Sequence, residues 1–132
     1  IVSSDGTKIP EYVITDIIMK DTKNIMSCSL VKVSNGDDTY YVCHLEFQPN
    51  TKTSKNSILD SCAKRLVNKI PGDIIDKLYF RVRSFEESFP AAPSGKRDTG
   101  SLVNEGITDK CEKVNIYLEE KNQKTLKKNL FV

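Results

Sequence analysis

Two runs of alternating side chains around an Asn-Gly turn constrain the fold of this chain more than any other feature. The second run, residues 40–48, places its most apolar side chains on one face: Tyr41, Cys43, Leu45 and Phe47. Successive side chains of a strand point to opposite faces, so this alternation predicts a half-buried strand. Asn35-Gly36 lies between the runs and tolerates the positive φ that tight hairpin turns need. The first run, residues 26–33, alternates less regularly, which predicts burial on both sides or a bulge. Residues 28–47 therefore predict a β-hairpin.

The remaining apolar patterns predict three more strands and one helix. Residues 11–19 are β-branched and apolar on both faces, as in a buried strand, and residues 111–118 predict a last strand. Residues 57–70 have helical spacing from a capping-box-like Ser57 to the stop at Pro71-Gly72. The expected core-facing stripe of this helix comprises Leu59, Cys62, Ala63, Leu66, Val67 and Ile70.

Residues 77–85 form the second clear strand pattern. Leu78, Phe80 and Val82 share one face. The opposite face carries Tyr79, Arg81, Arg83 and Phe85, and we expect both arginines to be solvated. A long connection, residues 86–109, follows and contains the dibasic pair Lys96-Arg97. A loop of this length in a compact domain is typically functional or partly disordered.

Length and charge limit the class of protein. The 132 residues predict one domain at 11–118, with an arm at 1–10 and a charged tail at 119–132. The chain begins at Ile1 without Met, as a mature form or an excised fragment would. A net charge of +2 is too small to indicate a nucleic-acid partner, and the absence of a long apolar run argues against direct membrane insertion.

Four cysteines, an even number, fit a secreted disulfide framework. The alternative is a cytosolic protein with four buried thiols, and the absence of an Asn-x-Ser/Thr acceptor counts against secretion. His44 is the only histidine, and no cysteines form a C-x-x-C pair, so we expect no metal site.

The residues give little support for an enzymatic function. We expect His44 to be an exposed polar side chain, on the face of its strand opposite Cys43. The chain has no phosphate-binding glycine loop and no nucleophile elbow. We therefore expect a non-enzymatic protein without a cofactor.

The order of elements and the four cysteines resemble the ZP-N domain of egg-coat proteins, over roughly residues 12–118. The resemblance implies a mainly β fold, an immunoglobulin-like antiparallel sandwich with one short helix. It also implies two disulfides, Cys28–Cys111 and Cys43–Cys62, and gives Tyr79 the place of a tyrosine that the family carries before its last loop.

Within the family, the sequence looks most like the repeats of vitelline-envelope receptors for sperm lysin. The implied protein is secreted into the extracellular matrix of the egg coat. Its implied partners are a basic, lysin-like sperm protein and other copies of the same domain, which an unpaired outer strand would help to bind.

A basic partner would prefer acidic surface, and interface hot spots favour aromatic side chains. The acidic candidates are Asp37, Asp38, Glu46, Glu86 and Glu87. The aromatic candidates are Tyr79, Phe85 and Phe89. For Asp37-Asp38, turn chemistry alone is the simpler explanation.

Two rival functions stay open. One is a secreted inhibitor or immune-modulating β-domain that binds a host protease or chemokine, although the Gln-x-Val-x-Gly hairpin of cystatins is absent. The other is a cytosolic binding module with free thiols.

Overall fold

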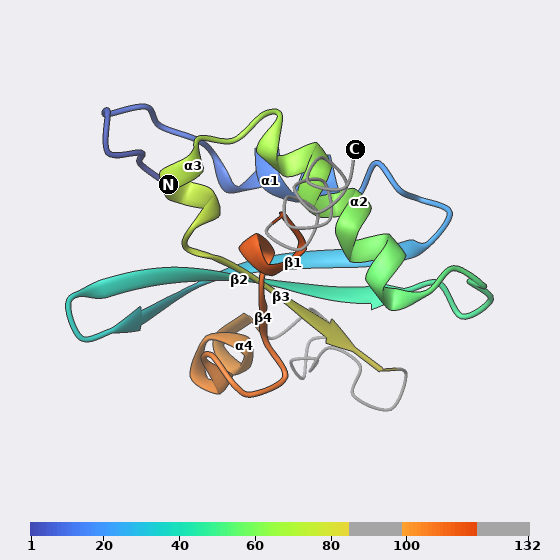
Figure 1. Cartoon of the computed structure of the whole chain (residues 1–132). Coiled ribbons are helices and arrows are strands. Elements are labelled where there is room, and N and C mark those ends of the chain that lie inside the picture. Colours follow the sequence, from blue (N-terminus) through green and yellow to red (C-terminus); the bar gives the residue numbers. More distant parts are fainter. Residues whose placement is uncertain (85–98, 119–132) are drawn as a thin grey trace, which may run out of the picture.

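The computed structural model describes residues 1–84 and 99–118 and builds them around one mixed four-stranded sheet in the order β1-β2-β3-β4. The strands are β1 (Ile25–Asn35), β2 (Asp38–Phe47), β3 (Leu78–Arg83) and β4 (Glu112–Lys113). The helices are α1 (Glu11–Ile18), α2 (Lys55–Val67), α3 (Gly72–Ile75) and α4 (Thr99–Glu105), and residues 114–118 are also helical. Figure 1 shows β2 and β3 running in the same direction across the centre of the molecule.

The expected immunoglobulin-like sandwich is wrong. The structure is a mixed α/β fold in which β2 and β3 are parallel, while β1–β2 and β3–β4 are antiparallel. Parallel neighbours need a crossover connection, and α2 and α3 supply it between β2 and β3. The crossover covers one face of the sheet with helices, so no second sheet is needed to bury that face.

The predicted hairpin is confirmed. Asn35 pairs with Asp38, and the strands stay in register through Val31↔Val42 to Cys28↔Leu45. Gly36 has φ of 66° at the first of the two turn positions, as a type II′ turn requires.

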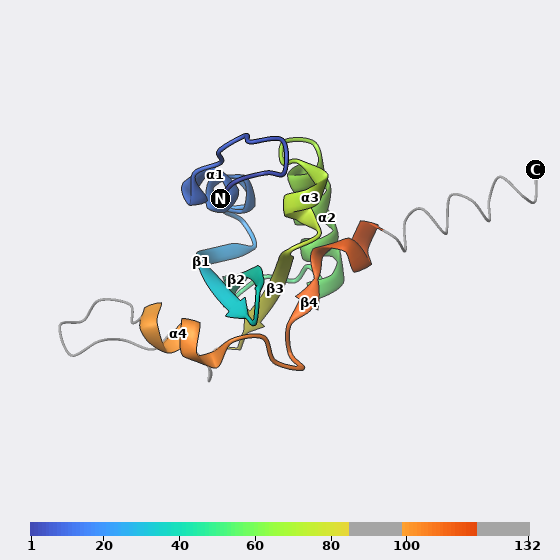
Figure 2. The ribbon, with the colours of Figure 1, turned by 90° about the vertical axis from the view of Figure 1, so that its left-hand side faces the viewer.

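The two faces of the sheet carry two separate apolar clusters. Leu30, Cys43, Leu45 and Phe80 belong to the larger cluster, which includes the buried residues of α1, α2 and α3. The smaller cluster, on the opposite face, consists of Val31, Val33, Val42 and Leu102 of α4. Figure 2 shows α1, α2 and α3 on one side of the sheet and α4 on the other. The predicted division of the side chains of β2 and β3 between two faces is therefore confirmed, but the half-burial predicted for β2 is wrong, because both of its faces are covered.

Residues 11–18 form helix α1 and Met19 is its C-cap, so the strand predicted at residues 11–19 is wrong. Ile14, Ile17 and Ile18 are buried at helical spacing, whereas Tyr12 is 65% exposed. A short β-branched apolar run fits a buried strand and a helix segment equally well by composition. Packing against α2 and β1 favours the helix over the strand here.

Helix α2 begins two residues earlier and ends three residues earlier than predicted. Its N-cap is Ser54, whose Oγ accepts a hydrogen bond from the backbone N–H of Ser57 at 3.2 Å. Ser57 is therefore the third helical residue rather than the cap. The predicted stripe is buried except for Val67, which is 46% exposed.

The final predicted strand is mostly helical. Only residues 112 and 113 pair with β3, and residues 114–118 turn into a helix. Val114 and Tyr117 are buried three residues apart, while Ile116 is 42% exposed. This spacing suits a helix and not a strand.

Both predicted disulfides are wrong, because all four cysteines are free thiols. Cys28 packs against the larger cluster and Cys111 against the smaller one, on opposite faces of the sheet. A Cys28–Cys111 bond would therefore have to cross the sheet. Cys43 and Cys62 are both fully buried in the larger cluster. Burial first, and then the neighbouring thiols of Cys28 and Cys62, raise the pKa of Cys43 well above its ordinary value, which keeps it as an apolar thiol.

Within residues 1–84 and 99–118, no helix is long and apolar enough to cross a bilayer.

Candidate functional site

A charged cluster lies between the sheet and α4. His44 of β2 pairs in register with Arg81 of β3, and both are buried, at 0% and 3% exposure. Arg83 Nη1 donates to Glu105 Oε2 at 2.8 Å and lies 3.2 Å from His44 Nδ1. The expectations that His44 is exposed and that the two arginines are solvated are therefore wrong. Helix α4 comes from a distant part of the chain and covers this face.

The electrostatics of the cluster keep His44 neutral. Burial, followed by the charge of Arg83, lowers the pKa of His44 from 6.5 to about 4, although Glu105 acts in the opposite direction. A guanidinium only donates hydrogen bonds, so Nδ1 accepts and the imidazole proton resides on Nε2. Glu105 also lies 3.7 Å from Arg81 Nη2. The cluster thus joins α4 to β2 and β3, and its histidine is shielded from solvent.

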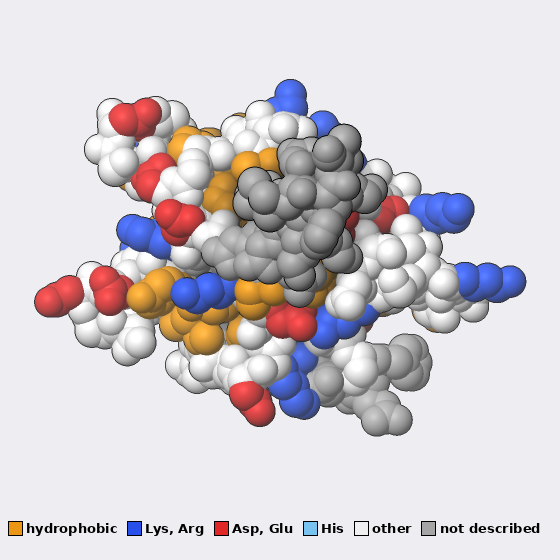
Figure 3. All heavy atoms as spheres, viewed as in Figure 1, with side chains coloured by type: hydrophobic (Ala, Val, Ile, Leu, Met, Phe, Trp, Pro, Cys, Tyr) orange, Lys and Arg blue, Asp and Glu red, His pale blue; other side chains and the backbone are white. Residues whose placement is uncertain are grey.

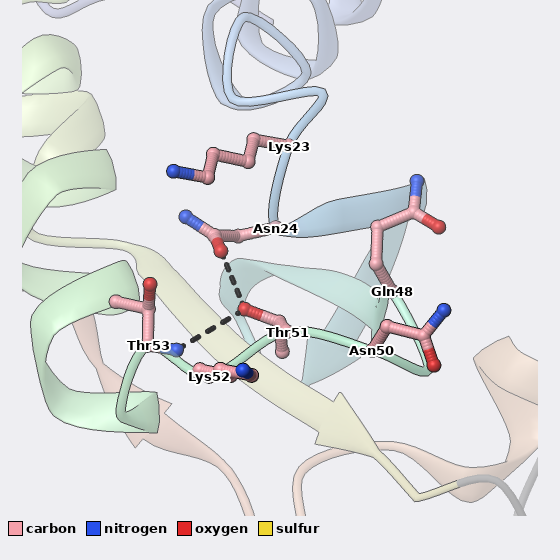
Figure 4. A pocket seen from close by; sticks show the side chains of 7 residues that line it. All are labelled: Lys23, Asn24, Gln48, Asn50, Thr51, Lys52 and Thr53. Carbon is pink, nitrogen blue, oxygen red and sulfur yellow. Dashed lines mark hydrogen bonds between the residues drawn. The ribbon is translucent and has the colours of Figure 1, made fainter.

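A second region, at the carboxyl ends of β2 and β3, is open to solvent. In open α/β sheets, ligands bind outside the carboxyl ends of parallel strands. A polar pocket of about 400 Å³ lies there, beside the end of β2. Its lining residues carry amides, hydroxyls and ammonium groups: Lys23, Asn24, Gln48, Asn50, Thr51, Lys52 and Thr53. Figure 4 shows Lys23 and Asn24 on one side and the segment from Thr51 to Thr53 on the other.

Hydrogen bonds hold the floor of this polar pocket. Gln48 N–H donates to the carbonyl oxygen of Asn24 at 2.7 Å, which ties the two segments together beyond the last strand pair. The Thr51 hydroxyl donates to Asn24 Oδ1 at 2.5 Å and accepts from Thr53 N–H at 3.3 Å (Figure 4). Asn24 is itself fixed by its amide, which donates to Asp21 at 3.1–3.2 Å. The Asn24 amide and the Thr51 hydroxyl therefore fix the shape of the pocket, and their hydrogens are already donated within the protein.

The side chains that line the polar pocket carry positive charge only, and the nearby Asp21 carboxylate, which bonds the Asn24 amide, is not part of the lining. Lys23 and Lys52 are exposed, and no acidic residue lines the pocket. The N-terminus of the 13-residue helix α2 follows Thr53 directly, and its first turn contains no acid. The N-terminal end of a helix carries partial positive charge, which adds to that of the lysines. In Figure 3, basic side chains project at this end, and acidic side chains lie both beside them and at the opposite end, over the hairpin tip.

A second hollow, of about 360 Å³, adjoins the polar pocket and shares Gln48 with it. Apolar side chains from three strand ends line this apolar groove: Met26, Phe47, Pro49 and Val82. Glu46, Arg83 and Ser84 add polar groups to the lining. The carboxyl ends of the parallel pair thus carry two contiguous hollows of different chemistry.

The partner-binding residues predicted from the sequence do not gather in one place. Asp37 and Asp38 are exposed at the hairpin tip. Glu46 lies eight residues along β2, roughly 26 Å away, and accepts a hydrogen bond from Ser27 at 2.9 Å. Tyr79 packs edge-on against Tyr40, with ring centroids 5.9 Å apart. The remaining candidates lie outside the described residues: Phe85, Glu86, Glu87, Phe89 and the dibasic pair Lys96-Arg97.

The lysines and amides of the polar pocket were not predicted as site residues, because they fall in two polar segments that are typical of a turn and a loop. One signal could have found them. The hairpin register continues to Ile25↔Phe47, so residues 24 and 48 must be neighbours. Two polar segments that carry lysines and no acid at residues 22–24 and 48–53 would then face each other.

Within the described part of the chain, no three His, Cys, Asp or Glu side chains are grouped closely enough to hold a metal ion.

Comparisons with known proteins give no family. No family model and no curated protein sequence matches the chain. One matching solved structure is a Mycobacterium tuberculosis fatty acyl CoA synthetase, at 19% identity and a TM-score of 0.44. The match covers 70% of this chain and 16% of that chain. A likeness at this level shows neither a shared fold nor a shared activity.

Proposed function

We propose that the protein is a binding module that holds a small oxyanion of the phosphate or sulfate class in the polar pocket. The observation that carries the proposal is an acid-free lining in which Lys23 and Lys52 lie on either side of amide and hydroxyl groups. Ammonium groups bind phosphate as point charges, and the Asn50 amide and the Thr53 hydroxyl, which also line the pocket, can donate to the remaining oxygens. A volume of about 400 Å³ is within the range of pockets for small organic ligands.

Titration of isotope-labelled protein with inorganic phosphate, followed by NMR at constant ionic strength, tests the proposal. We expect the amide signals of residues 51–53 to shift saturably, and sulfate in a parallel titration separates the two oxyanions. Lys52→Gln should weaken binding at least fivefold, because the variant loses one of two charges. Lys69→Gln is the matched control, since it removes an exposed lysine beyond the opposite end of α2.

Equal effects of Lys52→Gln and Lys69→Gln would show that any binding is general charge screening, and the proposal would fail. Shifts that never saturate, with phosphate and with sulfate, would have the same consequence.

The egg-coat role, and the alternative role as a secreted inhibitor, stay predictions. The resemblance behind the first depended on a sandwich fold and two disulfides, and this chain has neither. A direct binding measurement with a sperm lysin would test that role. The proposal for the polar pocket does not depend on the result.

A further inference from the structure

We infer that the ligand of the polar pocket is amphiphilic, with its anionic head between Lys23 and Lys52 and an apolar chain in the neighbouring apolar groove. This inference rests on the proposed function. It names the class of ligand: an alkyl or aryl group attached to a phosphate or sulfate.

A β-bulge builds the apolar groove. The pairing of β1 with β2 shifts between Ile25 and Ser27, because Ile25 pairs with Phe47 and Ser27 with Glu46. Met26 is the extra residue, and its side chain is 43% exposed. Bulges redirect side chains and are common next to functional sites. This one leaves a flexible, polarizable methionine at the mouth of the groove, where it can adapt to an apolar chain.

The floor of the apolar groove continues the hydrophobic core. Phe47 and Val82 are half-buried and pack against the larger apolar cluster. Together with exposed Pro49 they present apolar surface from the end of β2 and the end of β3. An apolar chain laid along this surface would remove it from water, which favours binding in proportion to the area covered.

The charges that line the polar pocket and the apolar groove decide which of the two holds the anionic head of the ligand. Glu46 lines the apolar groove and repels an anion there. The charge of Arg83, which also lines it, is offset by Glu105 at 2.8 Å. The polar pocket has two lysines and no acid. An anionic head is therefore favoured in the polar pocket, and the apolar chain points toward Met26 and Val82.

Gln48 connects the hollows and sets the path of the ligand. Its side-chain Nε2 donates to the carbonyl oxygen of Thr22 at 3.3 Å, and its backbone N–H donates to Asn24. These bonds hold Gln48 in place between the two hollows. A ligand must cross over it, so a chain of only one or two carbons cannot reach the groove.

A chain-length comparison on the whole protein tests the inference. Ethyl phosphate and octyl phosphate, the latter kept below its micelle concentration, are titrated by calorimetry. Each buried methylene tightens binding by about fourfold. Burial of only three of the six additional methylenes predicts an advantage of roughly 60-fold for octyl phosphate.

Two variants locate the effect. Met26→Gln should reduce the octyl advantage at least threefold and leave ethyl phosphate binding unchanged. Lys52→Gln should weaken both ligands equally. Val67→Gln, which replaces an exposed apolar residue on α2, is the matched control and should change neither. Circular dichroism melting curves confirm that each variant is folded.

The outcomes separate the two proposals. Equal affinities for ethyl and octyl phosphate would overturn the amphiphilic ligand and leave the oxyanion pocket standing. Binding of neither ligand would overturn both. An octyl advantage that Met26→Gln and Val67→Gln reduce equally would place the chain elsewhere and overturn the inference alone.

Discussion

Acidification should destabilise the protein through His44 in a pH window that can be calculated from its surroundings. The folded pKa of this histidine is about 4, and the unfolded value is about 6.5. The unfolded chain therefore binds the proton first as the pH falls. The stability that His44 contributes is complete above pH 6.5 and is lost progressively as the pH falls from 6.5 to 4.

The expected loss follows from the difference between the two pKa values. A shift of about 2.5 units at about 1.4 kcal/mol per unit gives a fall of about 3 kcal/mol in the free energy of unfolding. Burial is the largest cause, and Arg83 and Arg81 repel the imidazolium, while Glu105 compensates in part. The pKa of Asp73 is lowered from 3.8 by its bonds to Ser4 and Ser3, so its stabilising contribution is lost only below that window.

Urea unfolding between pH 7.5 and 4.5 measures this slope, with His44→Gln as the comparison. The variant cannot take up the proton, so its free energy of unfolding should change much less over the same range. His44 is the only histidine, and its ring protons therefore report its titration directly by NMR. A folded-state titration near pH 6.5, or parallel pH profiles for the two proteins, would refute this account of the cluster.

Three further predictions follow from the packing. Under non-reducing denaturing conditions a thiol reagent should count four free thiols, and a lower count would show that a disulfide is present. In the native protein, Cys43 and Cys62 should react far more slowly than Cys28 and Cys111, because both are fully buried. Ile14→Ala should lower the free energy of unfolding by about 3 kcal/mol and Tyr12→Ala by less than about 0.5, measured with urea; similar losses would contradict the helical face of α1. Ser54→Ala should cost about 1 kcal/mol in the same assay through loss of the N-cap, and no change would argue against a helix that starts at Lys55.

In the polar pocket and the apolar groove, only some of the neighbouring residues could be predicted from local sequence patterns. The hairpin register was predictable, and with it the neighbourhood of Asn24 and Gln48. The placement of Val82 beside Phe47 was not, because it depends on the parallel pairing of β2 with β3. That pairing joins segments separated by more than thirty residues, and nothing local specifies the partner of a strand edge.

The state of the cysteines could not be predicted from local sequence patterns either. Four cysteines fit a disulfide framework by count, yet a free cysteine is also a small, buried apolar residue. Cys28 and Cys111 lie on opposite faces because one belongs to β1 and the other precedes β4, next to α4. Their separation follows from the topology and not from their spacing in the chain.

The sequence by itself determined the hairpin of β1 and β2, the two faces of β2 and β3, and most of the buried stripe of α2. These features depend on periods of two and 3.6 residues, which neighbouring residues set. Only the tertiary structure decided that the second face of the sheet is interior as well. Local alternation shows that the two faces of a strand differ, but the burial of His44 and Arg81 required α4, which returns from a distant part of the chain to cover them.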